Sequence, residues 1–469
     1  MSLLSSPAQR RLWKTYVGIT VVYALINGLY SSYTFLYIKH RLEHAGGVSG
    51  SILDNLLFII IASMVFEFFA EPITGDWADA HGRRRVLAGT FLGLSLAFLT
   101  YWSISAAAIT ELSPAAELRI VIALALAAEF LFSVSSALFT GALDAWFVDE
   151  LRIAGGPEAG ALLPLFALQR RWFGVFMVTG GVVSLWIGRS VIQGEPTTGG
   201  LFAIPALPWL AAAGLTAITA LWIQLAMSER RTAAPGNEPS YRRIWLRLRR
   251  ALSLRDLRNA LLISSVLYTC WICFMYLLPV LLTEKQVRSE AGPLRAVLDD
   301  YYWFYLAMGT SRFIGPFLST RFRLGGNQIR QFRWWGVLNC GALAIGGSAL
   351  LWRALDVAHP GGRMALVPLA LVAFWVAKVA EEAFKPVRST YLNHLVVDSA
   401  DRAFVLSIAT PFGAVIILVG IGLLAAAQHV VRALDEMQFS VPLLFVILGA
   451  LGVAVTVNRS RGSRRPVSR

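Results

Sequence analysis

Several ionisable side chains lie inside long apolar runs of this chain, and they are Glu129, Arg312, Lys378, Glu381 and Glu382. A charge in apolar surroundings costs several kcal/mol, so each residue is a candidate for proton coupling. Lys378 precedes Glu381 and Glu382 by three and four residues, which places the cation beside both acids on a helix. The alternatives are neutralising ion pairs for this cluster and a hydrogen-bonded structural acid for Glu129.

Glu129 begins a polar stripe inside the apolar run 118–143. Ser133, Ser136 and Thr140 follow it at helical spacing, so they share one face of a helix. Such a face lines a cavity or packs on polar neighbours. The stripe therefore predicts either a transport pathway or a polar helix contact.

A second polar cluster is the segment 75–85, which holds two glycines, two acids, a histidine and three arginines. Apolar runs at 52–74 and 86–109 flank it. About 20 apolar residues cross a bilayer core about 30 Å thick, and both flanks reach that length. We therefore expect a tight polar turn over 75–85 between two membrane helices.

The composition indicates an all-α integral membrane protein. Of 469 residues, 56% are hydrophobic and 15% are charged, whereas soluble domains carry about 25% charge. The apolar runs predict twelve spans, near 16–38, 52–74, 86–109, 118–143, 165–188, 201–226, 259–283, 301–320, 333–352, 364–386, 404–428 and 440–458. An even count places both termini on one side of the bilayer.

The basic residues are distributed unequally between the two sides of the predicted bundle. Of the 42 lysines and arginines, 30 fall in the termini and loops of one side and 10 in the loops of the other. The positive-inside rule therefore predicts cytoplasmic termini in the inner (plasma) membrane. Because the net charge of +14 is spread over these short loops, it indicates topology rather than nucleic-acid binding.

The longest cytoplasmic connection divides the spans six and six. The sequence predicts two six-helix halves at 1–228 and 259–458, a linker at 229–258 and a basic tail at 459–469. In the linker, basic and apolar residues at 241–250 alternate at helical spacing. We expect an amphipathic helix on the anionic inner leaflet, and an ordinary solvated linker is the alternative.

The turn and the architecture together resemble the major facilitator superfamily. Its signature G-x-x-x-D-x-x-G-R-[RK] is complete here as Gly75, Asp79, Gly82, Arg83 and Arg84. The resemblance in architecture covers the whole chain, whereas the resemblance to a specific motif is confined to this turn. The residues that precede the turn resemble bacterial efflux-type members. The resemblance implies a twelve-helix fold of two six-helix halves.

The resemblance also implies a gate at this turn. Asp79 would cap the start of helix eleven, and Arg83 would pair with Asp144 or Asp149 at the end of helix four. Gly82 would allow the chain to reverse direction. The alternative is that the arginines only determine topology.

In this superfamily helices one, four, seven and ten line a central cavity. The resemblance therefore implies substrate contacts from polar and aromatic residues, which are Tyr23, Asn27, Tyr30, Thr34, Ser133, Ser136, Tyr268, Trp271 and Trp375. Aromatic helix faces are also common in ordinary packing, and that interpretation stays open.

Enzyme motifs do not occur in the sequence. It has no G-x-x-x-x-G-K-[ST] loop and no histidine spacing typical of a metal site, so we expect no enzyme activity, no cofactor and no metal. Cys270 and Cys273 form C-x-x-C inside an apolar run and are interpreted as small hydrophobes.

These features predict a monomeric, proton-coupled secondary transporter that exports a small organic molecule by alternating access. Glu129 is the first candidate for the protonation step, and Glu381 with Glu382 is the second. Few fixed charges among aromatic residues favour apolar or weakly cationic substrates. The alternatives are a nutrient uptake symporter and a non-transporting receptor or scaffold.

Overall fold

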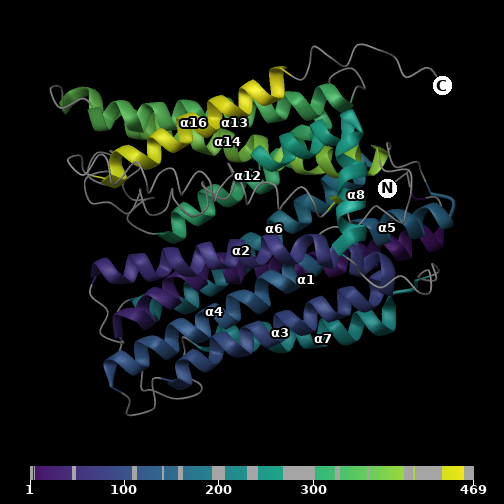
Figure 1. The fold of residues 1–469 in the computed structure, drawn as a ribbon, viewed down its shortest axis with the longest axis horizontal. Coiled ribbons are helices and arrows are strands. Elements are labelled where there is room, and N and C mark those ends of the chain that lie inside the picture. Colours follow the sequence, from purple (N-terminus) through teal and green to yellow (C-terminus); the bar gives the residue numbers. More distant parts are fainter. Residues whose placement is uncertain are drawn as a thin grey trace. The chain divides into compact units, whose positions relative to one another are not determined.

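The computed structural model describes residues 4, 6–44, 49–107, 113–139, 142–156, 162–192, 206–229, 241–267, 301–322, 328–355, 360–395, 405–406 and 436–458. Every long regular element in these ranges is a helix. In chain order they are α1 (Pro7–His44), α2 (Ser49–His81), α3 (Arg83–Ala107), α4 (Pro114–Phe139), α5 (Ala142–Ile153), α6 (Leu163–Ile192), α7 (Leu207–Ala226), α8 (Tyr241–Ser253), α12 (Tyr301–Arg321), α13 (Gln328–Leu355), α14 (Pro360–Leu395) and α16 (Glu436–Asn458) (Figure 1).

The helices form two compact units. Unit one comprises Met1–Ala159, Trp172–Arg249 and Val396–Pro411, and unit two comprises Gly160–Arg171, Arg250–Leu395 and Phe412–Arg469. The division of the chain at the 229–258 linker stays a prediction.

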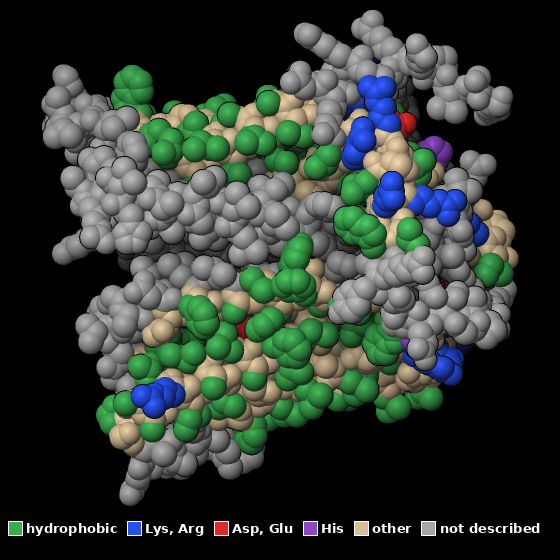
Figure 2. Space-filling view, viewed as in Figure 1, with side chains coloured by type: hydrophobic (Ala, Val, Ile, Leu, Met, Phe, Trp, Pro, Cys, Tyr) green, Lys and Arg blue, Asp and Glu red, His purple; other side chains and the backbone are tan. Residues whose placement is uncertain are grey.

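Several helices are suited to a bilayer. Five described helical stretches are long and apolar enough to cross one, and they are Pro7–Ser31, Arg83–Ser105, Pro114–Ile153, Leu207–Ala226 and Ile329–Arg353. Large apolar side chains such as Trp186 and Leu225 are 72% and 79% exposed, and Figure 2 shows hydrophobic side chains over much of the visible surface. Such a surface is typical of lipid contact. The chain therefore has an all-α membrane fold, although most of the predicted spans 259–283 and 404–428 lies outside the described residues.

Small residues let helices of unit one approach closely. Within this unit α3 packs on α4 and α7, and α2 packs on α4. A Cβ added to Gly28 in α1 would lie 1.9 Å from the Met177 carbonyl oxygen in α6, and one added to Gly180 would lie 2.1 Å from that of Leu25. The α1 and α6 backbones touch, as small residues permit between membrane helices.

Unit two is built around α13, which packs on α14 and α16. A Cβ added to Gly452 in α16 would lie 2.3 Å from the sulfur of Cys340, a buried residue of α13. The α13–α16 contact therefore also depends on a residue without a side chain.

The turn between the second and third spans is much shorter than predicted. The expected turn over 75–85 is wrong in extent, because α2 continues through Gly75 to His81 and α3 starts at Arg83. Only Gly82 leaves the helical conformation, with a φ of 92°. A single glycine in the left-handed region reverses the chain without the steric cost that a side chain adds.

Pro386 does not end its helix, although the predicted span 364–386 ends at this residue. Instead α14 runs from Pro360 to Leu395 and contains both Pro368 and Pro386. Each proline removes one backbone donor, and the remaining hydrogen bonds of a 36-residue helix maintain its continuity.

Candidate functional site

A buried carboxylate lies between three helices of unit one. Glu129 of α4 is 4% exposed. The Tyr30 hydroxyl of α1 lies 2.8 Å from Oε1 and 2.6 Å from Oε2 of Glu129, and the Tyr101 hydroxyl of α3 donates to Oε1. No lysine, arginine or histidine pairs with Glu129 in the described part of the chain. Two neutral hydroxyl groups therefore hold this acid.

Aromatic rings surround the same carboxylate. The Tyr30 ring stacks on Phe132 with centroids 3.6 Å apart, and the Tyr101 ring stacks on Trp209 at 4.7 Å. Aromatic faces carry partial negative charge and attract cations, as a carboxylate does. The site is therefore electrostatically suited to a proton or an organic cation.

The polar stripe of α4 packs on polar neighbours in unit one. Ser133 Oγ lies 3.0 Å from Ser63 Oγ of α2, and Ser136 Oγ lies 2.7 Å from the Tyr23 hydroxyl of α1. Of the two structures that the stripe predicted, these contacts match a polar helix contact. Glu129 is the one ionisable residue of the stripe.

The other predicted cavity residues differ in their surroundings. Asn27 Nδ2 donates to the Tyr23 carbonyl, and Thr34 Oγ1 donates to the Tyr30 carbonyl, so both side chains bond their own helix. In unit two, Trp375 Nε1 donates to Thr310 Oγ1 at 3.1 Å. Tyr268 and Trp271 lie outside the described residues.

Arg83 forms a buried ion pair at the start of α3. Its Nη1 donates to Oδ2 of Asp149 in α5, and the two side chains are 4% and 9% exposed. Of the two acids predicted as partners, Asp149 therefore contacts Arg83. Asp144 instead accepts a hydrogen bond of 2.6 Å from the Tyr16 hydroxyl of α1.

Glu229, which the sequence analysis missed, also contacts this turn. Its carboxylate accepts hydrogen bonds from the backbone N–H groups of Arg83 at 2.7 Å and Arg84 at 3.2 Å. These are the first residues of α3, so Glu229 caps the positive end of that helix. A Cβ added to Gly82 would lie 2.9 Å from Glu229 Oε2, so Gly82 also leaves room for this cap.

Further contacts hold the residues beside Glu229. Trp146 Nε1 of α5 donates to the Ser228 carbonyl at 2.9 Å, and Arg84 Nη1 donates to the Met227 carbonyl at 3.5 Å. The beginning of the linker is therefore bound to unit one. The sequence feature that could have indicated this cap is Glu229 itself, an acid shortly after the apolar run 201–226.

The other predicted gate residues can be placed only by their backbone. Gly75 and Asp79 both lie in α2. A glycine permits close approach of another helix, and an aspartate carries a negative charge. The side chain of Asp79 and most of the start of helix eleven lie outside the described part of the structure. The Asp79 cap on helix eleven stays a prediction.

Charged residues of α12 and α14 form one network in unit two. Lys378 Nζ lies 2.5 Å from Glu381 Oε2 and 3.3 Å from Glu382 Oε1. Lys385 Nζ lies 2.7 Å from Glu381 and 2.8 Å from Glu382, and Arg312 Nε of α12 lies 3.8 Å from Glu382. Both acids are therefore shared among cations, which distinguishes them from Glu129.

Gly315 brings the two helices of this network together. A Cβ on Gly315 would lie 2.5 Å from the Val379 carbonyl oxygen and 2.7 Å from the Ala383 nitrogen in α14. Arg312 lies one turn earlier on α12 and so faces the α14 acids. A larger residue at position 315 would separate the cation from its partner.

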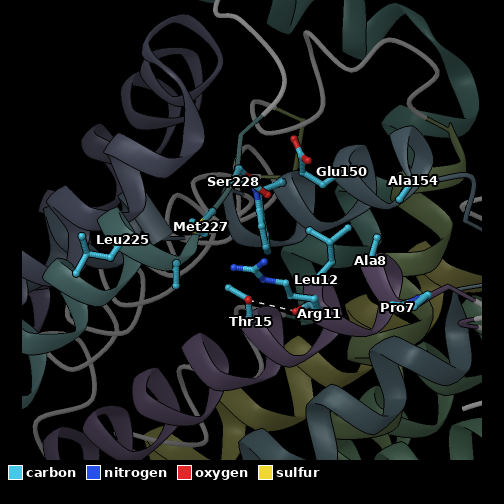
Figure 3. A pocket seen from close by; sticks show the side chains of 12 residues that line it. Pro7, Ala8, Arg11, Leu12, Thr15, Glu150, Ala154, Leu225, Met227 and Ser228 are labelled. Carbon is cyan, nitrogen blue, oxygen red and sulfur yellow. Dashed lines mark hydrogen bonds between the residues drawn. The ribbon is translucent and has the colours of Figure 1, made fainter.

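A cavity of about 500 Å³ lies at another place in unit one (Figure 3). Arg11 of α1, Trp146 and Glu150 of α5 and Met227 after α7 are among its lining residues. Of the residues predicted to line the substrate cavity, none that the structure describes borders it. In the described part of the chain, no three His, Cys, Asp or Glu side chains gather as a metal site would require.

No family model and no curated protein matches this sequence. Solved structures match it over almost its whole length. The human organic anion transporter MFSD10 is 16% identical over 95% of this chain and 100% of its own, with a TM-score of 0.62. A bacterial homologue of the iron transporter ferroportin is 15% identical over 97% and 100%, with a TM-score of 0.66.

A third match carries the family in its own description. The major facilitator superfamily proton:xylose symporter XylE is 12% identical over 96% of both chains, with a TM-score of 0.62. The chain has the fold of the major facilitator superfamily. These descriptions name an organic anion transporter, a homologue of an iron transporter and a proton:xylose symporter, so the major facilitator fold alone does not determine the cargo.

Proposed function

We propose that this chain is a secondary transporter that exports a small organic molecule in exchange for protons. The observation that carries the proposal is the Glu129 site, a buried carboxylate held by two tyrosine hydroxyls. A carboxylate buried without a cation is costly in its charged form, so a bound proton or cationic substrate stabilises it. The acid can therefore exchange one for the other.

The hydrogen bonds of Glu129 give such an exchange a mechanical consequence. An ionised carboxylate only accepts hydrogen bonds, so both tyrosine hydroxyls donate to it. A protonated carboxyl also donates, and one of its partners must then accept or rotate away. Because Tyr30 lies on α1 and Tyr101 on α3, proton binding changes contacts between three helices.

The substrate class that we propose is inferred from the same Glu129 site. The stacked Tyr30 and Phe132 rings beside the acid suit an apolar or weakly basic aromatic molecule. A cationic molecule competes with the proton for one carboxylate, which is the simplest form of antiport.

The gate and the orientation of the chain complete the proposal. The Arg83–Asp149 pair, with Glu229 on the α3 terminus, would act as a latch of unit one at the cytoplasmic side. The 30 to 10 distribution of basic residues supports cytoplasmic termini in the inner (plasma) membrane. We propose a monomer that alternates access between its two predicted halves.

Proteoliposomes with an imposed pH gradient test this function. A ligand is first found by thermal shift with a panel of aromatic amines, and its addition should then drive proton flux. Glu129→Gln should lower that flux by about tenfold or more, because an amide cannot take up and release a proton as the carboxyl group does. Glu117→Gln, on the first turn of the same helix, is the matched control and should leave the flux unchanged. Wild-type flux in Glu129→Gln would remove Glu129 from the mechanism.

Uptake by symport is the second candidate function. The descriptions of XylE and of the Escherichia coli protein FucP, which is 14% identical with a TM-score of 0.60, identify proton symporters. The same liposomes distinguish the two candidates by direction. Substrate and protons that move together indicate symport, whereas opposite movement indicates the proposed antiport.

A further inference from the structure

The linker helix α8 has an unusual composition for an exposed segment. Its sequence Tyr-Arg-Arg-Ile-Trp-Leu-Arg-Leu-Arg-Arg-Ala-Leu-Ser contains five arginines and no acid. By the 3.6-residue repeat, Trp245, Leu248 and Leu252 share one face. Leu246 and Arg250 lie on the other side, and Arg249 lies at the boundary between the two sides. The helix is therefore divided into an apolar side and a basic side.

Both sides of α8 are accessible in the structure. The Trp245 side chain is 64% exposed and Leu246 is 54% exposed. Arg249 and Arg250 are exposed as well, and Leu254 directly after the helix is 55% exposed. Figure 2 shows Lys and Arg side chains next to hydrophobic ones in this region. Trp245 is thus accessible, whereas Leu248 and Leu252 of the same face are half-buried.

The arginines of α8 would be stabilised by an anionic surface. Arg247 lies four residues after Arg243 and three before Arg250, and like charges at these spacings repel one another on a helix. No acid of α8 compensates this repulsion. Anionic headgroups would remove the repulsion, and the interface is also where tryptophan rings are enriched.

We propose that α8 binds the anionic lipid surface of the bilayer that the chain spans. Trp245, Leu248 and Leu252 lie in the boundary between headgroups and acyl chains, and the arginines contact lipid phosphates. The helix is tethered on one side by Met227–Glu229, which unit one holds, and on the other by the helical segment 255–267. This tethering maintains a high effective concentration of α8 at the membrane.

Spin labels on the full-length protein in nanodiscs test the proposal. Cys270, Cys273 and Cys340 are first replaced by alanine, and single labels are attached after Trp245→Cys or Leu246→Cys. Both positions are exposed in the structure and lie about 100° apart around the helix, Trp245 on the apolar side and Leu246 on the basic side, so they form a matched pair. Collision rates with oxygen, which enters lipid, and with a polar nickel complex report immersion.

With phosphatidylglycerol in the nanodisc, the label at 245 should meet oxygen more and nickel several-fold less than the label at 246. Phosphatidylcholine alone should reduce this contrast, and so should Arg249→Gln with Arg250→Gln. Because Trp245→Cys removes an anchoring ring, Leu252→Cys provides a second label position that retains it.

Three outcomes would overturn the proposal. Equal nickel accessibility at 245 and 246 in anionic nanodiscs means that α8 is a solvated linker. Equal contrast in neutral and anionic lipid means that the arginines do not recognise headgroups. Low collision rates of the label at 245 with both oxygen and nickel mean that another part of the protein covers the apolar face.

Discussion

At the scale of single residues, two sets of buried acids have different electrostatic roles. Glu381 and Glu382 each contact two lysines, so their charges are compensated within α14. Glu129 has only hydroxyl partners among the described residues. Replacing a shared ion-pair acid should therefore disturb stability first, whereas replacing Glu129 should first disturb the proton exchange that we propose.

Infrared spectroscopy should detect the Glu129 proton directly and without a substrate. We expect the difference spectrum between the wild type and Glu129→Gln to contain a carboxylic acid C=O band that disappears at alkaline pH, because the other acids contribute equally to both proteins. Tyr101→Phe should shift the band frequency, because the carboxyl group loses one hydrogen bond. Glu117→Gln should leave the band unchanged. Identical C=O bands in the wild type and in Glu129→Gln would assign the titrating proton to another acid.

Gly82→Ala should destabilise unit one by about 1–2 kcal/mol, because a side chain is strained at positive φ. The new Cβ would also press on Glu229 at 2.9 Å. Thermal unfolding in detergent measures the effect. Gly89→Ala is the matched control on the same α3 helix, since its Cβ would meet nothing within 4 Å.

The same measurement tests the Glu229 cap. Glu229→Gln should cost about 1 kcal/mol, as loss of a charged helix cap does. Combined with Gly82→Ala it should cost less than the sum of the two, because both variants disturb one contact. Strict additivity would show that Glu229 does not act through the α3 terminus.

At the scale of helices, glycines determine which elements can touch. Gly28 and Gly180 permit the α1–α6 contact in unit one, and Gly315 permits the α12–α14 contact in unit two. In a bilayer, helices associate through close packing rather than through the hydrophobic effect. Loss of a single close helix contact should therefore lower the stability of the unit measurably.

Gly315→Ala should destabilise unit two by about 1–3 kcal/mol, because the helices must separate to admit a methyl group. Gly341→Ala in α13 meets nothing within 4 Å and serves as the control. Thermal unfolding of both variants in one detergent gives the comparison. An equal melting temperature for the two would mean that α12 and α14 do not pack as closely as the structure has them.

At the scale of the whole molecule, the proposed transport cycle requires a gate that closes and opens. The turn at Gly82 joins an ion pair, a helix cap and the start of the linker within unit one. A rigid cluster of this kind can transmit a change in one helix to several others. We propose that this cluster acts as a latch, and a topology signal alone stays the alternative.

Asp79→Asn tests the gate at this scale. If Asp79 caps another helix as the resemblance implies, the variant should lose most transport while its membrane insertion and expression stay normal. Asp76→Asn, on the same end of α2, is the matched control. Reconstituted transport rates and the monodispersity of the purified protein provide the two readouts. Normal transport in Asp79→Asn would reduce the motif to a topology signal.

Much of the fold follows from local features of the chain. The apolar runs predicted helices at the described spans, because the bilayer thickness sets a length that any sequence window can reveal. The Gly75–Arg84 signature predicted the major facilitator fold that the solved structures match. Helix ends were less predictable: α2 extends into the expected turn and α14 passes through Pro386, since backbone hydrogen bonds continue beyond the apolar region.

The sequence by itself determined a membrane bundle, its charge asymmetry and the residues able to carry protons. Only the tertiary structure decided their partners: Asp149 rather than Asp144 for Arg83, Tyr30 and Tyr101 for Glu129, and Glu229 for the α3 terminus. The physical reason is distance along the chain. Helical spacing brings together residues three or four apart, whereas these partners come from separate helices whose approach depends on close packing.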